Sequence, residues 1–158
     1  MSIELVRPFL AQFGREQDIQ EFTVSSATVE LAAAALNVEP ARIAKTMSFA
    51  DGEGCLLVVT AGDTKIDNPK YKQTFGFKAK MLSPDQALAL TGHAVGGVCP
   101  FALPEGVRVF LDESMRRFET IFPAAGSSNS AIEVTPAQLE EYTGGIWVDV
   151  CKLREEVM

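Results

Sequence analysis

Histidine and cysteine are scarce in this sequence, and their scarcity excludes several kinds of site. The 158 residues include one histidine, His93, and three cysteines, Cys55, Cys99 and Cys151. No C-x-x-C pair is present, and no set of three or four zinc ligands can be recognised. An odd number of well-separated cysteines, two of them within apolar runs, argues against a disulfide framework. We therefore predict no structural metal, no disulfide framework and no cofactor.

Long apolar runs are also missing. The longest stretches, such as residues 55–59, are far shorter than the roughly 20 residues that a membrane-spanning helix needs. The first eight residues contain an early acid and a proline, whereas a signal peptide has a basic start and a continuous apolar stretch. These absences predict a cytoplasmic protein that has no membrane partner.

Positive charge is in the minority. Lysine and arginine total 14 against 21 acidic residues, which gives a net charge of −7. This balance argues against tight, non-specific binding to nucleic acid, and we expect no DNA partner. The lysines are unevenly distributed, however, because Lys65, Lys70, Lys72, Lys78 and Lys80 fall in one stretch. That stretch has two interpretations, a solvated lysine-rich surface or a local cationic patch.

Length and composition predict one globular domain over residues 1–158. Apolar residues make up 47% of the chain and charged residues 22%, which is ordinary for a folded protein. Apolar spacing, capping residues and glycine stops predict helices over residues 2–13, 25–36, 69–75, 84–91 and 135–143, with a short one after Pro40. β-branched and apolar runs predict strands over residues 22–24, 46–49, 55–60, 78–81, 107–111, 120–123, 131–134 and 146–150.

The order of these elements indicates the fold class. Residues 51–54 read as a hairpin turn, and the connections after residue 105 are too short for a regular βαβ alternation. We therefore expect an α+β fold with a mixed, curved β-sheet flanked by helices.

Three motifs could carry chemistry. The glycine-rich loop of residues 92–101 contains Gly96 and Gly97, whose backbone can approach a ligand closely, and backbone N–H groups in such a loop can polarise a carbonyl. Lys45 lies among apolar neighbours, so its stem should be packed and its ammonium directed at a particular acceptor. Residues 126–130 are rich in hydroxyls that could bond a small polar ligand. Each motif also has a structural interpretation, as a turn or as an exposed lysine.

Together these motifs resemble the YbaK/EbsC family, the free-standing relatives of the editing domain of prolyl-tRNA synthetase. The resemblance covers about residues 25–150. It rests on the order and spacing of the string at residues 41–46, the strand at 56–60, Gly92-His93, the stretch 96–100, and Gly126-Ser127-Ser128.

The resemblance implies a barrel-like sheet and a trans-editing hydrolase that cleaves the ester of mischarged aminoacyl-tRNA. Candidate substrates are prolyl-tRNA carrying cysteine or alanine and a serine- or threonine-type mischarge. The partner would be the 3′ end of aminoacyl-tRNA, with a synthetase or elongation factor as a further partner. The residues that it assigns to catalysis are Lys45, Gly96 and Gly97, and those that it assigns to substrate binding are His93, Val98, Cys99, Pro100, Gly126, Ser127 and Ser128.

The sequence departs from the family pattern at two positions. Relatives often carry serine where this chain has Cys99, and many carry glycine where it has Ala102, which leaves the amino-acid specificity open. Alternatives also remain for the chemistry. His93 could act as a general base or anchor the loop by a hydrogen bond, Cys99 could act as a nucleophile, and the whole domain could bind aminoacyl-tRNA or a synthetase without catalysis.

Overall fold

A long antiparallel hairpin forms the centre of the protein. The computed structural model describes residues 2–94 and 96–154. Strand β2 (Ile43–Asp51) pairs with β3 (Gly54–Ala61), and Lys45 lies opposite Thr60 in this register. Residues 55–61 of β3 are buried because both faces of the strand are covered. This explains why β3 reads as a continuous apolar run rather than as an alternation.

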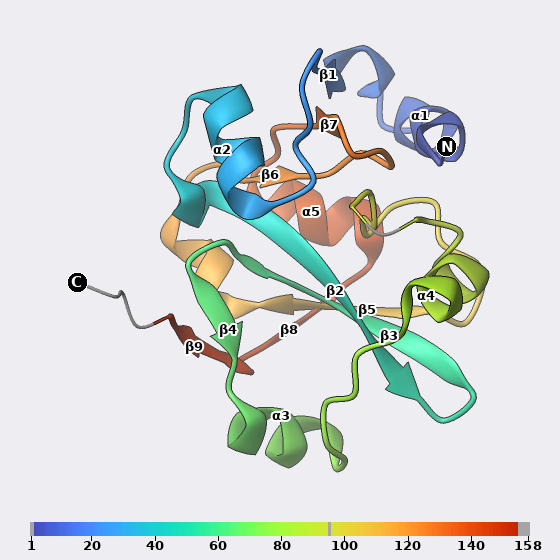
Figure 1. Ribbon diagram of the computed structural model, residues 1–158, viewed down its shortest axis with the longest axis vertical. Coiled ribbons are helices and arrows are strands. Elements are labelled where there is room, and N and C mark those ends of the chain that lie inside the picture. Colours follow the sequence, from blue (N-terminus) through green and yellow to red (C-terminus); the bar gives the residue numbers. More distant parts are fainter. Residues whose placement is uncertain (1, 95, 155–158) are drawn as a thin grey trace.

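The hairpin lies at the centre of a five-stranded mixed sheet, in the order β6-β2-β3-β5-β8. Strands β6 (Phe122–Pro123), β5 (Arg108–Asp112) and β8 (Ile146–Val148) run parallel to their neighbours. Two small antiparallel ribbons flank the sheet: β1 (Gln20–Glu21) with β7 (Ser130–Ala131), and β4 (Thr64–Ile66) with β9 (Cys151–Leu153). The curled sheet with its surrounding helices, visible in Figure 1, confirms the predicted α+β class.

Short, well-capped helices surround the sheet. They are α1 (Ile3–Ala11), α2 (Val29–Leu36), α3 (Asn68–Phe75), α4 (Pro84–Thr91) and α5 (Pro136–Thr143), with 3-10 turns η1 (Glu16–Asp18), η2 (Pro40–Arg42) and η3 (Glu113–Arg117). Both α4 and α5 begin with a capping box followed by proline, and both end at a left-handed glycine. Within the described residues, none of these helices has the length and apolar character to cross a bilayer.

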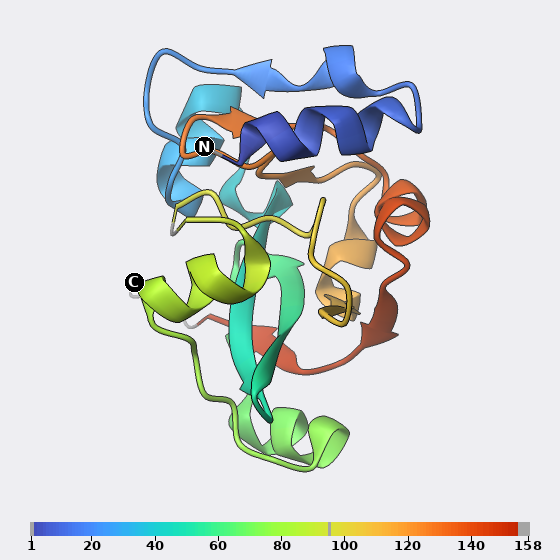
Figure 2. The same ribbon diagram turned by 90° about the vertical axis from the view of Figure 1, so that its right-hand side faces the viewer.

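Two apolar cores lie on opposite faces of β3. Val59 and Ala61 contribute to the larger one, which α1 and α5 close with residues such as Leu10 and Leu139. Leu56 and Val58 face the other core, which lies against α3 and includes the fully buried Tyr71. Figure 2 shows the consequence for the shape, with α1 and α3 at opposite ends of the molecule.

Several predicted element boundaries are wrong. Residues 22–24 form no strand, because the backbone of Phe22 bonds the loop residue Asn129 instead of a ladder partner. Residues 78–81, predicted as a strand, contain only one isolated bridge, between Met81 and Phe49. Of the strand predicted for residues 131–134, Ala131 belongs to β7 and Val134 forms an isolated bridge. The strand predicted for residues 146–150 ends at Val148. The ribbon of β4 and β9 was not predicted.

Candidate functional site

A gap in the edge of the sheet exposes part of β2. On the side away from β3, strand β6 pairs with Ile43 and Ala44 only. Further along β2, the segment after α3 bonds the strand instead. Ala50 donates its N–H to Lys80 O, and Leu82 donates its N–H to Ser48 O. Residues 45–47 lie between these two contacts. The site therefore lies beside the part of β2 that neither β6 nor the segment after α3 covers.

A cavity of about 210 Å³ occupies this gap. Its wall is mainly apolar, and hydroxyl groups from several elements interrupt it. Helix α2, strand β2 and helix α4, which surround this region in Figure 1, contribute to the wall together with the glycine loop and the chain near β6 and β7. The lining residues are Ser26, Ala27, Thr28, Val29, Ala32, Ile43, Ala44, Lys45, Thr46, Met47, Ser48, Met81, Leu82, Ala87, Gly96, Val98, Phe122, Ala124, Ser130 and Ala131.

Among the residues that the structure describes, Lys45 is the one cation that lines this cavity. Strand β2 begins at Ile43, so Lys45 lies within the strand, whereas the strand predicted from the sequence began one residue after it, at Thr46. The half-buried side chain donates from Nζ to Thr64 O at 2.5 Å. Burial lowers the pKa of the ammonium, and the nearby Arg154 lowers it further, while Glu30 and Asp63 act in the opposite direction. An ammonium carries three N–H donors, so two remain to bind an oxygen of a ligand.

The structure brings the two predicted glycine motifs together. An added Cβ on Gly97 would lie 2.9 Å from Ser127 Cα, so the loops pack backbone to backbone. Gly96 has a positive φ of 92° and faces Ala27 and Ser128. The Gly97 N–H donates to Ala94 O at 2.9 Å and is therefore occupied within its own turn. That bond counts against the expectation that this N–H polarises a substrate carbonyl.

Three residues predicted to bind substrate lie behind the cavity wall instead. His93, Cys99 and Pro100 are buried and do not line the cavity. The His93 Nε2 atom lies 2.8 Å from Phe101 O, which assigns its proton to a loop-anchoring hydrogen bond, and burial lowers the pKa of the ring. Burial raises the pKa of the Cys99 thiol to about 12. Neither group has the environment of a base or nucleophile that reaches a substrate.

In the hydroxyl-rich stretch after β6, Gly126, Ser127 and Ser128 support the site without lining it, whereas Ser130 lines it. Ser127 is buried, and its Oγ lies 2.6 Å from Ser130 Oγ, which does line the cavity. Ser128 O accepts from the N–H of Ser26 at 2.6 Å and so fixes the segment that leads into α2. Gly126 abuts Ile3 at the start of α1, where no Cβ would fit. This loop therefore holds the glycine loop, α1 and the α2 segment against one another.

Comparison with known proteins identifies the family. Residues 23–142 match the family model of the aminoacyl-tRNA editing domain, and this range includes every residue that lines the cavity. The chain belongs to the aminoacyl-tRNA editing family.

Members of this family with known sequence or structure match most of the chain. The "Uncharacterized protein YwhH" of Bacillus subtilis is 54% identical over 154 residues, which are 96% of this chain and 98% of that protein. The "Putative Cys-tRNA(Pro)/Cys-tRNA(Cys) deacylase EbsC" of Enterococcus faecalis is 26% identical over 78% of this chain and 76% of its own length. The structure of "a putative trans-editing enzyme for prolyl tRNA synthetase" superposes with a TM-score of 0.87 at 26% identity, covering 96% of this chain and 97% of the other.

Within this editing domain, sequence reasoning missed most of the cavity wall. Thr46 and Ser48 line it from β2, and the Thr46 hydroxyl is buried without a hydrogen-bond partner in the described structure. A polar side chain that interrupts a buried strand is a signal that could have drawn attention to both residues. The apolar wall residues Met47, Met81 and Phe122 carry no comparable signal, because apolar residues of a strand or loop are ordinarily core.

Proposed function

We propose that this protein is a trans-editing hydrolase that cleaves the ester bond of mischarged aminoacyl-tRNA. The observation that carries the proposal is the position of Lys45, a half-buried cation that lines a small, mainly apolar cavity at an open strand edge. Membership of the aminoacyl-tRNA editing family supports the same class of substrate. The ester consists of a small amino acid joined to a polyanionic chain, which suits an apolar recess with a cation beside it.

The dimensions of the cavity favour a small amino acid. At about 210 Å³ the space lies below the roughly 300–1,000 Å³ that accommodates drug-sized ligands. Val29, Ile43 and Phe122 supply apolar walls, whereas Ser48 and Ser130 supply hydroxyls. The side chains of alanine, cysteine, serine and threonine all fit within this space, and those of serine and threonine could also bond the hydroxyls. Proline tRNA charged with cysteine or with alanine is therefore the first substrate to test.

Charge and position are sufficient to explain the catalysis. In the reaction a water, which the neighbouring ribose hydroxyl can orient, adds to the ester carbonyl. The bond to the tRNA oxygen then breaks, that oxygen takes up a proton from the water, and the free amino acid and a terminal hydroxyl are released. Lys45 would hold the carbonyl or the terminal phosphate with the N–H groups that Thr64 O leaves free. Residues 45–47 of β2 would fix the substrate along the open edge. No covalent intermediate is required, which agrees with the burial of Cys99.

Replacement of Lys45 tests this proposal. Lys45→Met keeps most of the side-chain volume and removes the charge, whereas Lys45→Ala removes both, so the pair separates packing from electrostatics. We expect each variant to lose about a hundredfold or more of its turnover of mischarged tRNA, since one lost electrostatic contact costs a few kcal/mol of barrier.

The assay measures the release of labelled amino acid from a panel of mischarged tRNAs. The first two substrates are the proline tRNA charged with cysteine and the same tRNA charged with alanine. Urea unfolding of each variant checks that the fold is retained. Wild-type turnover by Lys45→Met would contradict the role of the ammonium. Binding of charged tRNA by the wild type without any release of amino acid would favour the alternative, a non-catalytic module that binds aminoacyl-tRNA or a synthetase.

A further inference from the structure

Half of the cations of this protein form no ion pair with an acid of the described residues. Of the 14 lysine and arginine residues, seven form an ion pair with an aspartate or glutamate within 4 Å. The paired ones are Lys70 and every arginine except Arg154. Among the described residues the remaining seven have no such pair: Lys45, Lys65, Lys72, Lys78, Lys80, Lys152 and Arg154.

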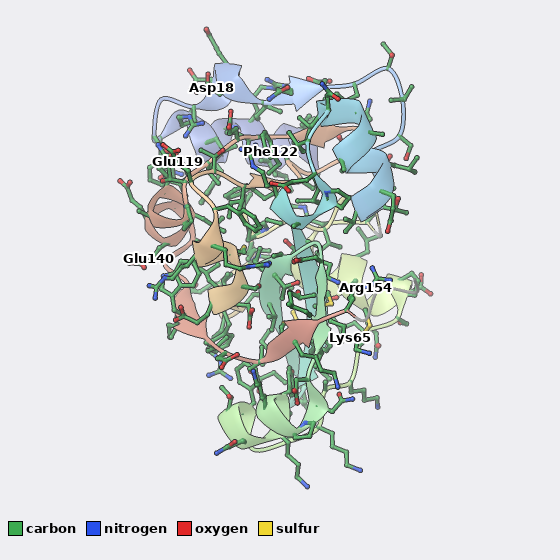
Figure 3. All side chains as sticks on the ribbon, turned by 90° about the vertical axis from the view of Figure 1, so that its left-hand side faces the viewer. Asp18, Lys65, Glu119, Phe122, Glu140 and Arg154 are labelled. Atoms are coloured by element: carbon green, nitrogen blue, oxygen red, sulfur yellow. The ribbon has the colours of Figure 1, made fainter. Side chains whose placement is uncertain are left out.

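These seven cations are not spread over the molecule. Apart from Lys45 they come from β4, from α3 and the segment that follows it, and from β9 with the residue after it. Helix α3 and strand β9 are adjacent, because Lys70 Nζ donates to Cys151 O at 3.2 Å. Figure 3 labels Lys65 and Arg154, which lie near one another beside this ribbon. We call the five exposed lysines, Lys65, Lys72, Lys78, Lys80 and Lys152, the lysine face.

Within residues 2–94 and 96–154, few acidic side chains accompany the lysine face. Asp67 is the only acid between residues 64 and 83, and its carboxylate accepts the N–H of Lys70 at the start of α3. The nearby Asp149 pairs with Lys70. Lys65 lies directly opposite Lys152 in the ribbon of β4 and β9. Like charges in directly opposite positions destabilise a strand pair, so folding alone does not account for this arrangement.

A short segment of the chain joins the lysine face to the cavity. A surface hollow lined by Asn68, Pro69, Lys72, Lys78 and Ala79 lies between α3 and the segment after it. That segment continues through Lys80 to Met81 and Leu82, both of which line the cavity. An extended chain spans about 3.3 Å per residue, so Lys78 and Leu82 are separated by about 13 Å along it. This length corresponds to about four nucleotide steps at 3.4 Å each.

We propose that the lysine face binds the phosphodiester backbone of the acceptor end of the tRNA whose aminoacylated 3′ terminus occupies the cavity. This inference rests on the proposed function for the identity of the polyanion. Five compact ammonium groups with no acidic partner suit phosphate oxygens, which a lysine contacts as a point charge without reading sequence. The lysine face would therefore position any tRNA by its backbone, while the cavity selects the amino acid.

The test compares two triple variants of the lysine face. Replacing Lys72, Lys78 and Lys80 by glutamine removes three charges, and replacing the same three residues by arginine keeps them. Binding of uncharged tRNA is measured by fluorescence anisotropy between 50 and 200 mM salt, which needs no hydrolysis. Each lost phosphate contact lowers the slope of log K against log salt by about 0.7–0.9, so we expect the glutamine variant to lose about two units of slope and at least tenfold in affinity at 100 mM salt. The arginine variant should bind as the wild type does.

Kinetics separate this inference from the proposed function. The glutamine variant should show a raised KM for mischarged tRNA with an unchanged kcat. Its KM for an aminoacylated CCA trinucleotide should rise less, because the trinucleotide extends past Lys80 but not past Lys78. If the wild type cleaves neither substrate, the proposed function fails, and the binding data alone then decide on the lysine face. An unchanged tRNA affinity and salt slope in the glutamine variant would overturn the inference. So would binding of the wild type to anionic phosphatidylserine vesicles but not to tRNA.

Discussion

Replacing Gly97 by alanine measures how strongly the site depends on the contact between its two loops. Gly97 is not among the glycines with positive φ, so its backbone accepts a side chain and only the space matters. The new Cβ would lie 2.9 Å from Ser127 Cα and 3.0 Å from Ser127 N and C, and these backbone atoms cannot rotate away. Ordinary contact requires the loops to separate by about 0.5 Å, and such overpacking costs about 1–3 kcal/mol.

The expected loss is measurable in both stability and activity. With a urea dependence of about 2 kcal/mol per molar, a cost of 2 kcal/mol lowers the unfolding midpoint by about 1 M. Gly96 and Val98 would move with the loop and change the cavity wall, so kcat/KM for a mischarged tRNA should fall about tenfold to a hundredfold. Gly54→Ala is the matched control, because its Cβ would meet only Asp51 O at 3.7 Å. The reasoning is refuted if Gly97→Ala has the wild-type midpoint.

Two further predictions concern stability. Ala102 has a φ of +55°, so Ala102→Gly should relieve left-handed backbone strain and raise the melting temperature by about 2 °C. The control is Ala34→Gly within α2, which should lower the free energy of unfolding by about 1 kcal/mol. Because burial raises the pKa of Cys99 from 9.0 to about 12, the folded state keeps a proton that the unfolded chain releases, and stability should fall as the pH rises from 9 towards 12. Cys99→Ser should flatten that decline in urea titrations between pH 8 and 10.5, and a decline of the same slope in this variant would contradict the assignment.

Elements with strong local signals were predictable from the sequence. The capping residues and prolines that open α4 and α5 have the same roles in the structure, and the apolar run of β3 forms a buried strand. The errors occur where pairing depends on distant residues. Whether residues 78–81 form a strand depends on β2 being free at its edge beyond Ser48, and the ribbon of β4 and β9 joins segments more than 80 residues apart. Local sequence carries no signal for such contacts.

The same distinction applies to the site. Lys45, Gly96 and Val98 could be selected from the sequence, and all three line the cavity. His93 and Cys99 were selected because their side chains can be reactive, yet both are fully buried behind the wall. Chemical type indicates what a residue can do, whereas exposure decides what it can reach, and exposure in a loop follows from its packing. The position of the wall residue Ser130 depends on the pairing of β7 with β1, in which its partner Glu21 lies more than 100 residues earlier.

The net charge of −7 and the lysine face lead to a single account of tRNA binding once ion pairing is considered. Composition counts all cations equally, but the paired arginines present little free charge to a polyanion. Charges more than about 8 Å apart are largely screened at physiological ionic strength, so a docked nucleic acid responds to the nearby unpaired lysines rather than to the total. The acidic remainder disfavours approach in other orientations. In the proposed mode of binding few phosphates are held at a time, so we expect the affinity for tRNA to be modest and to fall as the salt concentration rises.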